Sequence, residues 1–326
     1  MSSIYAMLAI IIIGSVTTIV FFDVMIPYLK RLKYGQTVRS EGPSEHFKKN
    51  GTPTMGGIII TISSIIIFLT LILFNYKNVD LNYKEILILI IPYIGFSIIG
   101  FIDDFIIVVK KNNVGLKPLI KFILQLIISA VTYFLILETR NTDTINFFGY
   151  PFKMSFLYGI FIILGFSGIT NATNITDGLD GLLGGSAIIV ICGILVLSKN
   201  TENFVVTYFS LSLIVALIAF MFYNMPKASI FMGDTGSLAI GSAIFSLLIL
   251  LNMDLLVFVF GSIYLIETLS VMLQVWFFKR TKGKRIFKMA PIHHHFEKCG
   301  WGERKIVAVA ATITAILCAA SYFLTM

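Results

Sequence analysis

Apolar runs of about twenty residues recur along almost the whole chain, and they constrain its fold more than any other feature. A helix of about twenty apolar residues is long enough to cross roughly 30 Å of hydrocarbon. Such runs are predicted as membrane spans near residues 4–22, 58–74, 86–102, 119–137, 155–170, 183–198, 205–222, 237–252, 255–278 and 305–325. The runs are unbroken rather than alternating, which excludes an outer-membrane barrel. We therefore expect an all-α, polytopic membrane protein with about ten transmembrane helices.

The composition supports a single membrane-embedded unit. Hydrophobic residues make up 57% of the 326 residues and charged residues only 13%, whereas a soluble domain carries roughly a quarter charged residues. This balance excludes a soluble enzyme and a disordered protein. The chain has no internal repeat or separate polar domain, so we expect one integral-membrane domain over residues 1–326. Its three cysteines are far apart and match no disulfide or zinc pattern.

The positions of lysine and arginine predict how the chain is oriented. If the N-terminus lies outside, the outer loops keep only a few of the 25 lysines and arginines, namely Lys77, Lys84, Arg140, Lys153 and Lys199. Cytoplasmic loops carry such an excess of positive charge. We therefore expect both termini outside the cytoplasm, and we attribute the net charge of +8 to topology rather than to nucleic-acid binding.

Five polar segments all fall on the predicted cytoplasmic side. They cover residues 51–57, 101–105, 171–182, 231–237 and 291–297. Random scatter would have spread them over both sides of the membrane. The pattern therefore predicts a functional site on the inner face.

Aspartates dominate these segments. Burying a charge in the membrane costs on the order of 2.5–3.5 kcal/mol at mid-depth, so the adjacent Asp103 and Asp104 indicate a cation ligand or a proton acceptor. If a helix begins near Asp177, that residue and Asp180 share one face near its N-terminus, although Asp180 is equally well explained as a helix cap. Asp234, in the sequence Gly-Asp-Thr-Gly-Ser, either caps a helix or holds Mg²⁺ beside a phosphate-binding loop.

The side chains available favour magnesium over zinc. Hard oxygen ligands with few nitrogen or sulfur partners suit Mg²⁺ or Mn²⁺. His293, His294 and His295 are consecutive and point in different directions on any regular backbone, so we interpret them as donors to phosphate or to a base. Glu267 lies inside an apolar run and is expected to face the bundle interior, either as a packed or paired structural carboxylate or beside a substrate groove.

Together these segments resemble a known family, the polyprenyl-phosphate N-acetylhexosamine-1-phosphate transferases. The resemblance covers nearly the whole chain and includes Thr-Pro-Thr-Met-Gly-Gly at 52–57 with the four other segments in order. The three consecutive histidines before Phe296-Glu297 resemble the histidine motif of the family branch that uses a muramoyl-pentapeptide donor.

The resemblance implies ten spans, a cytoplasmic active site in a bacterial plasma membrane, dependence on Mg²⁺, and a homodimer. It implies transfer of phospho-N-acetylmuramoyl-pentapeptide from UDP-MurNAc-pentapeptide to undecaprenyl phosphate, with release of UMP, in peptidoglycan synthesis. The implied catalytic carboxylates are Asp103, Asp104 and Asp177, and the implied magnesium ligand is Asp234. The residues expected to contact substrate are Lys49, Thr54, Lys121, Asn171, Asn174, Asp180, His293, His294 and His295.

Two other functions remain open at this point. A transferase that uses UDP-N-acetylglucosamine has the same chemistry, and only the histidine motif argues against it. A transporter or flippase tends to place its carboxylates near the bilayer midplane, often in repeated halves, whereas these aspartates cluster at one membrane edge. Direct attack by the lipid phosphate and a covalent acyl-phosphate route also remain open; we favour direct attack, because a phosphate monoester is already a nucleophile near neutral pH.

Overall fold

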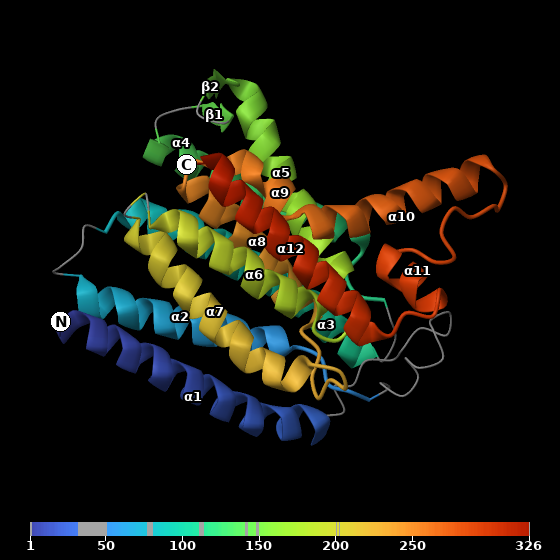
Figure 1. Ribbon diagram of the computed structural model, residues 1–326, viewed down its shortest axis with the longest axis horizontal. Coiled ribbons are helices and arrows are strands. Elements are labelled where there is room, and N and C mark those ends of the chain that lie inside the picture. The colour runs from blue at the N-terminus through green and yellow to red at the C-terminus, as the bar shows by residue number, and fades with distance from the viewer. Residues whose placement is uncertain are drawn as a thin grey trace.

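The computed structural model describes residues 2–31, 51–76, 81–110, 114–140, 143–147, 150–199, 201 and 203–325, and these are mostly helical (Figure 1). The helices are α1 (Ser2–Arg31), α2 (Gly56–Asn75), α3 (Tyr83–Lys110), α4 (Pro118–Arg140), α5 (Phe156–Thr176), α6 (Leu182–Ser198), α7 (Phe204–Asn224), α8 (Gly233–Leu250), α9 (Val257–Phe260), α10 (Ser262–Arg280), α11 (Ile292–Lys298) and α12 (Glu303–Thr325). A 3₁₀ turn, η2 (Asp254–Leu256), precedes α9. The predicted all-α membrane fold is confirmed.

One short β-hairpin was not predicted. The strands β1 (Thr144–Phe147) and β2 (Tyr150–Lys153) pair antiparallel between α4 and α5, with Thr144 opposite Lys153 and Phe147 opposite Tyr150. A strand pair this short gives only a weak alternating pattern, and the apolar runs on either side dominate the sequence. The hairpin is a local addition to a helical bundle.

The helices match the predicted apolar runs, but they do not establish the number of spans. Within the described residues, eight helices are long and apolar enough to cross a membrane, or nine if the segments Asp254–Phe260 and Ser262–Arg280, bent by 73°, form one span. The α6 helix has 17 residues and falls in a shorter class. The ten-span count and the outside location of both termini stay predictions.

The α8 helix forms the centre of the bundle. Every residue from Thr235 to Leu250 is buried, because α3 and α5 pack along this helix while α2, α6 and α7 also contact it. The outer helices follow, with α1 against α2 and α7, α4 against α3 and α5, and α12 against α6 (Figure 1). Since α8 begins at Gly233, its first turn carries the polar segment 231–237 into the middle of the protein.

Small residues hold this first turn close to its neighbours. A Cβ added to Gly57 of α2 would overlap the backbone of Gly236, and one added to Gly100 of α3 would overlap the carbonyl of Asp234. Membrane helices pack closely through such residues. The Thr173 hydroxyl of α5 adds a hydrogen bond of 2.8 Å to the carbonyl of Ser237.

The α3 helix continues past the end of its predicted span. The apolar run stops at residue 102, yet α3 extends to Lys110 and contains Asp103 and Asp104, which are buried. Both carboxylates accept hydrogen bonds inside the protein. The helix can therefore continue past the apolar run without exposing them to water.

No helix begins at Asp177, so the condition under which Asp177 and Asp180 would share a helix face is not met. The α5 helix extends to Thr176 with Asp177 as its C-cap, and α6 begins only at Leu182. Asp177 and Asp180 consequently lie in the turn between two helices rather than on one face of a helix. Nor does Asp180 cap α6, because Gly181 occupies the N-cap position.

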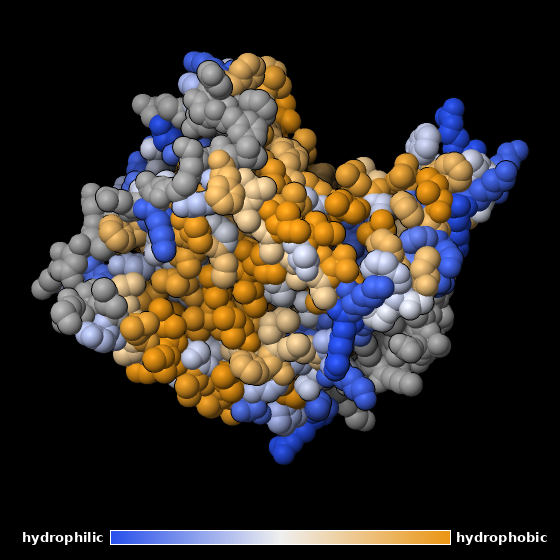
Figure 2. Space-filling view, in the orientation of Figure 1, coloured by the Kyte–Doolittle hydropathy of each residue, from blue (hydrophilic) through white to orange (hydrophobic). Residues whose placement is uncertain are grey.

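The surface fits a protein embedded in lipid. Figure 2 shows apolar side chains covering much of the helical face, with hydrophilic ones gathered toward helix ends and at the far end of α10. The helix α10 extends away from the bundle (Figure 1) and exposes Leu269, Met272 and Trp276.

Two glycines provide a matched test of the close packing around α8. We expect Gly100→Ala to destabilise the protein by about 1–3 kcal/mol, the usual cost of overpacking a tight contact. We expect Gly168→Ala in α5 to be neutral or stabilising by up to about 1 kcal/mol, because an added Cβ there meets nothing within 4 Å. Thermal unfolding in detergent measures both, and equal stabilities for the two variants would contradict the packing described.

Candidate active site

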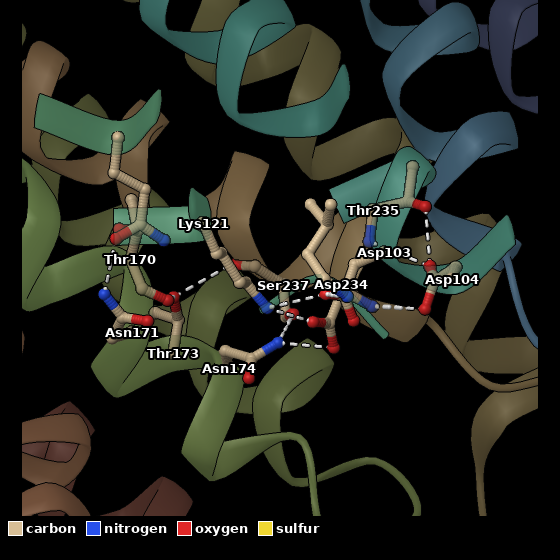
Figure 3. Close-up of polar contacts among 12 residues, drawn as sticks. Asp103, Asp104, Lys121, Thr170, Asn171, Thr173, Asn174, Asp234, Thr235 and Ser237 are labelled. Atoms are coloured by element: carbon tan, nitrogen blue, oxygen red, sulfur yellow. Dashed lines mark hydrogen bonds and ion pairs between the residues drawn. The ribbon is translucent and has the colours of Figure 1, made fainter. Parts of the chain in front are cut away.

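Asp234 lies at the centre of the polar cluster. Its carboxylate accepts hydrogen bonds from the Lys121 ammonium of α4 and, at 2.7 Å, from the Asn174 side-chain amide of α5 (Figure 3). The same Asn174 amide lies 2.9 Å from the Ser237 hydroxyl, one turn further along α8. Two helices, α4 and α5, thus direct polar side chains at one carboxylate of α8.

Asp104 fixes the start of α8. This carboxylate, 4% exposed, accepts hydrogen bonds from the backbone N–H groups of Asp234 and Thr235 at 3.1 and 3.0 Å and from the Thr235 hydroxyl at 2.6 Å. The first backbone N–H groups of a helix have no partner within it, and Asp104 supplies one from α3. Asp104 therefore holds the backbone that carries Asp234.

Asp103 lies on the other side of Lys121. Its carboxylate accepts a hydrogen bond of 2.9 Å from the backbone N–H of Leu116 and is 3.9 Å from the Lys121 ammonium. Lys121 is thus a positive charge shared by Asp103 and Asp234 (Figure 3). The predicted meeting of these residues at one location is observed.

The turn between α5 and α6 adds a further carboxylate. Asp177 is partly buried, and the nearby backbone of Gly233 favours its ionised form. Burial, together with the negative charges of Asp234 and Asp104, raises the pKa of Asp177 well above its usual range. Asp177 therefore lies within the electrostatic reach of the cluster.

Asp180 faces a different set of groups. It is 2% exposed, and its carboxylate accepts a hydrogen bond of 2.9 Å from the backbone N–H of Ala228. Its own backbone N–H donates to the Glu303 carboxylate at 2.7 Å. These contacts join the α5–α6 turn to α12 and to the loop before α8; the substrate contact expected of Asp180 stays a prediction.

The segment before α2 lies against the segment before α8. The backbone N–H of Phe231 donates to the carbonyl of Pro53 at 2.8 Å, and the N–H of Gly56 donates to the carbonyl of Phe231 at 2.9 Å. Thr54 is buried beside Gly233, and its hydroxyl has no hydrogen-bond partner among the described residues. Lys49 lies outside the described residues.

Asn171 is not brought to Asp234. Its side-chain amide donates to the Gln125 side chain at 2.8 Å and to the carbonyl of Ser167 at 2.7 Å. Asn171 precedes Asn174 by about one turn of α5, so it pairs with α4 deeper in the bundle. Gln125, which the sequence analysis did not single out, lies one turn after Lys121 on α4.

The three histidines have separate partners. His293 lies 3.0 Å from the Glu267 carboxylate, and His294 lies 2.6 Å from Glu297. The Nδ1 atom of His295 accepts a hydrogen bond of 3.0 Å from the backbone N–H of Lys288. The expectation that they point in different directions agrees with these contacts.

The oxygen ligands at this cluster suit a magnesium ion. Mg²⁺ usually binds through one or two carboxylates together with substrate phosphates and water. Asp234 and Asp103 already share a cationic group, the Lys121 ammonium, so positive charge is favoured between them. The described residues contain no group of three His, Cys, Asp or Glu side chains arranged around a metal. A magnesium ion here would therefore depend on substrate oxygens for part of its coordination.

Comparison with known proteins gives a consistent result. A model described as glycosyl transferase family 4 matches residues 86–252, and a phospho-N-acetylmuramoyl-pentapeptide-transferase signature matches residues 49–60. Proteins named phospho-N-acetylmuramoyl-pentapeptide-transferase are similar over nearly their whole length. The one from Staphylococcus epidermidis is 47% identical over 96% of each chain, and the one from Clostridium botulinum is 41% identical over 95% of this chain and 94% of its own.

The two adjacent aspartates are expected to differ in their effect on stability. We expect Asp104→Asn to lower the free energy of unfolding by about 1.5–3 kcal/mol, since it weakens charged hydrogen bonds to the first turn of α8. Asp103→Asn keeps an oxygen for the Leu116 N–H and should change the free energy of unfolding by less than about 1 kcal/mol. Chemical denaturation in detergent distinguishes them, and an equal loss in both variants would contradict the capping role of Asp104.

The raised pKa of Asp177 predicts a pH-dependent stability. The folded protein retains a proton that the unfolded chain releases above about pH 3.9, so the ionisation of Asp177 destabilises the folded state as the pH rises. Asp177→Asn keeps an oxygen beside the Gly233 backbone and removes this cost. We expect the variant to melt above wild type at neutral pH without divalent cations, with the difference shrinking toward pH 4. A variant that melts below wild type at neutral pH would contradict the prediction.

Proposed function

The chain belongs to the phospho-N-acetylmuramoyl-pentapeptide transferases of glycosyl transferase family 4, and we propose that it transfers phospho-N-acetylmuramoyl-pentapeptide from UDP-MurNAc-pentapeptide to undecaprenyl phosphate. The reaction releases UMP and yields the first lipid intermediate of peptidoglycan. It takes place at the cytoplasmic face of a bacterial plasma membrane. The distribution of lysine and arginine supports this sidedness.

One observation carries the proposal. Asp103, Lys121, Asn174 and Asp234 come from four different helices and meet in one contact network at the start of α8 (Figure 3). Transfer of a phosphorylated sugar requires mainly positioning and neutralisation of phosphate charge. A cluster of carboxylates with one shared ammonium, at the end of an apolar bundle, provides for both.

The reaction forms one phosphorus–oxygen bond and breaks another. An oxygen of the lipid phosphate attacks the β-phosphorus of the donor, and the bond from that phosphorus to the bridging oxygen of UMP breaks. Asp103 accepts a proton from the lipid phosphate when that group arrives protonated. The Lys121 ammonium contacts phosphate oxygens and offsets their charge, while Asn174 holds Asp234 in place.

In this mechanism Asp234 would hold the magnesium ion, and Asp103 is the neighbouring carboxylate. When bound, Mg²⁺ supplies neutralisation of the pyrophosphate and makes UMP a better leaving group. The acceptor keeps its polyprenyl tail in the bilayer and the donor is soluble in water. A site at the membrane edge admits both without moving either one across. A homodimer, which the family resemblance implies, stays a prediction.

A reconstitution experiment tests the proposal. Purified full-length protein in detergent is given UDP-MurNAc-pentapeptide and undecaprenyl phosphate, and UMP release is measured. We expect turnover to require both the lipid phosphate and Mg²⁺, and we expect Asp234→Asn to lower kcat by roughly 10²-fold or more, as loss of a group that stabilises transition-state charge does. Asp143→Asn, a charge removal beside the exposed Lys153, serves as the control with unchanged activity.

Two results would contradict the proposal. Turnover with UDP-N-acetylglucosamine alone would assign the protein to the related transferases that use that donor. A covalent phospho-sugar adduct formed on the protein without lipid acceptor would replace direct attack by a two-step route.

A further inference from the structure

Glu267 is a buried carboxylate in α10, outside the contact network of Asp234. It is 4% exposed, and an ionised group inside a membrane helix is costly unless it is paired. Its Oε2 atom is 3.0 Å from His293 Nδ1 and accepts a hydrogen bond of 3.3 Å from the backbone N–H of His293. Two contacts from one carboxylate thus connect α10 to α11.

A polar stripe on α10 holds the segment that leads to α11. Glu267, Ser270 and Gln274 are all buried, and their spacing places them on one helix face. The Gln274 side-chain oxygen accepts hydrogen bonds of 3.1 and 2.9 Å from the backbone N–H groups of Ile286 and Phe287. The stripe therefore binds the segment between α10 and α11 at Ile286 and Phe287, and it binds α11 itself at His293. The α10 helix thus sets the orientation of His293.

The two nitrogens of the His293 ring have different surroundings. A carboxylate is an acceptor only, so the proton lies on Nδ1, which donates to Glu267. The opposite atom, Nε2, is buried without a hydrogen-bond partner among the described residues. Nε2 lies against Gly178, where an added Cβ would overlap it, and Gly178 is adjacent to Asp177.

An unpaired atom at this location requires an explanation. Leaving a buried polar atom without a partner costs about 1–3 kcal/mol, and native proteins do so rarely. The turn between α5 and α6 carries Asp177, which lies within the electrostatic reach of Asp234. Nε2 is therefore directed at the edge of the candidate active site.

We propose that Glu267 is a positioning residue for the transfer reaction. It holds His293 with Nδ1–H on its carboxylate and directs Nε2 toward the Asp177 turn as the atom that meets the substrate. The proposal rests on the function proposed above. His294 and His295 have their Nδ1 partners in or next to α11, so the carboxylate from α10 selects His293 among the three.

The first experiment measures the tautomer. Full-length protein with ¹³C,¹⁵N-labelled histidine is studied by NMR in bilayers, and His293→Gln assigns the His293 resonances. We expect wild type and Glu267→Gln to carry the proton on Nδ1, because a glutamine oxygen also accepts it, and Glu267→Ala to shift it to Nε2. Glu297→Gln, which alters the partner of His294, should leave the His293 resonances unchanged. A wild-type ring without a proton on Nδ1, or an unchanged ring in Glu267→Ala, would overturn the proposal.

The second experiment measures whether Glu267 acts through His293. We expect Glu267→Ala to lower kcat about 10- to 100-fold, by analogy with the range for removing the hydrogen-bond partner of a metal-ligating histidine, with KM for the lipid acceptor unchanged. His293→Gln should lower kcat by about as much. The double variant Glu267→Ala/His293→Gln should lower kcat no further than His293→Gln alone, since the effects of residues that act as a unit are not additive. Glu138→Gln, which neutralises an exposed carboxylate paired with Lys84, should keep the full rate.

The outcomes separate this proposal from its alternatives. Additive losses in the double variant, or a full rate in Glu267→Ala, would show that Glu267 is structural and would overturn the proposal. If Glu267→Ala does not fold, Glu267→Leu, which fills a similar space without an acceptor, makes the same test alone and combined with His293→Gln. Absence of UMP release by wild type would refute the proposed function, whereas the NMR measurement would still test the Glu267–His293 pair.

Discussion

The contact between Asp104 and the first turn of α8 is the interaction on which the rest of the site depends. One buried carboxylate accepts two backbone N–H groups and one hydroxyl, and so satisfies donors that a helix start leaves free. The partners of Asp234 come from α4 and α5, and they reach it only because α8 begins at this position. The same contact of Asp104 therefore both caps α8 and fixes the geometry of the site.

Negative charge is gathered here at considerable cost. Several carboxylates near one another disfavour ionisation, and the low polarity of the bundle adds to this cost. Lys121 offsets part of it by contacting both Asp103 and Asp234. The remaining excess of negative charge explains why a divalent cation suits the site. A soluble protein could relieve such a cluster with water, whereas a membrane bundle relies on its own side chains.

The sequence predicted the elements of this structure better than their contacts. Apolar run length is a local property, so each predicted run coincides with a helix or with a bent helix pair. The assembly of the aspartates followed from their shared predicted side of the membrane. The partners were not predictable, because they depend on segments far apart in the chain. Asp180 binds the backbone of Ala228 and Asn171 binds Gln125, and no spacing rule brings those residues together.

The burial of α8 has a consequence for how the protein is made. Among the eight unbroken helices of the described residues that are long and apolar enough to span the membrane, α8 and α5 have the lowest hydropathy, and both carry polar residues of the site. Such segments enter the lipid phase less readily by themselves than strongly apolar ones. Their insertion during biosynthesis therefore depends on neighbours already in place. Substitutions on α3 or α5 that weaken this support would lower the yield of inserted protein before they affect any step of catalysis.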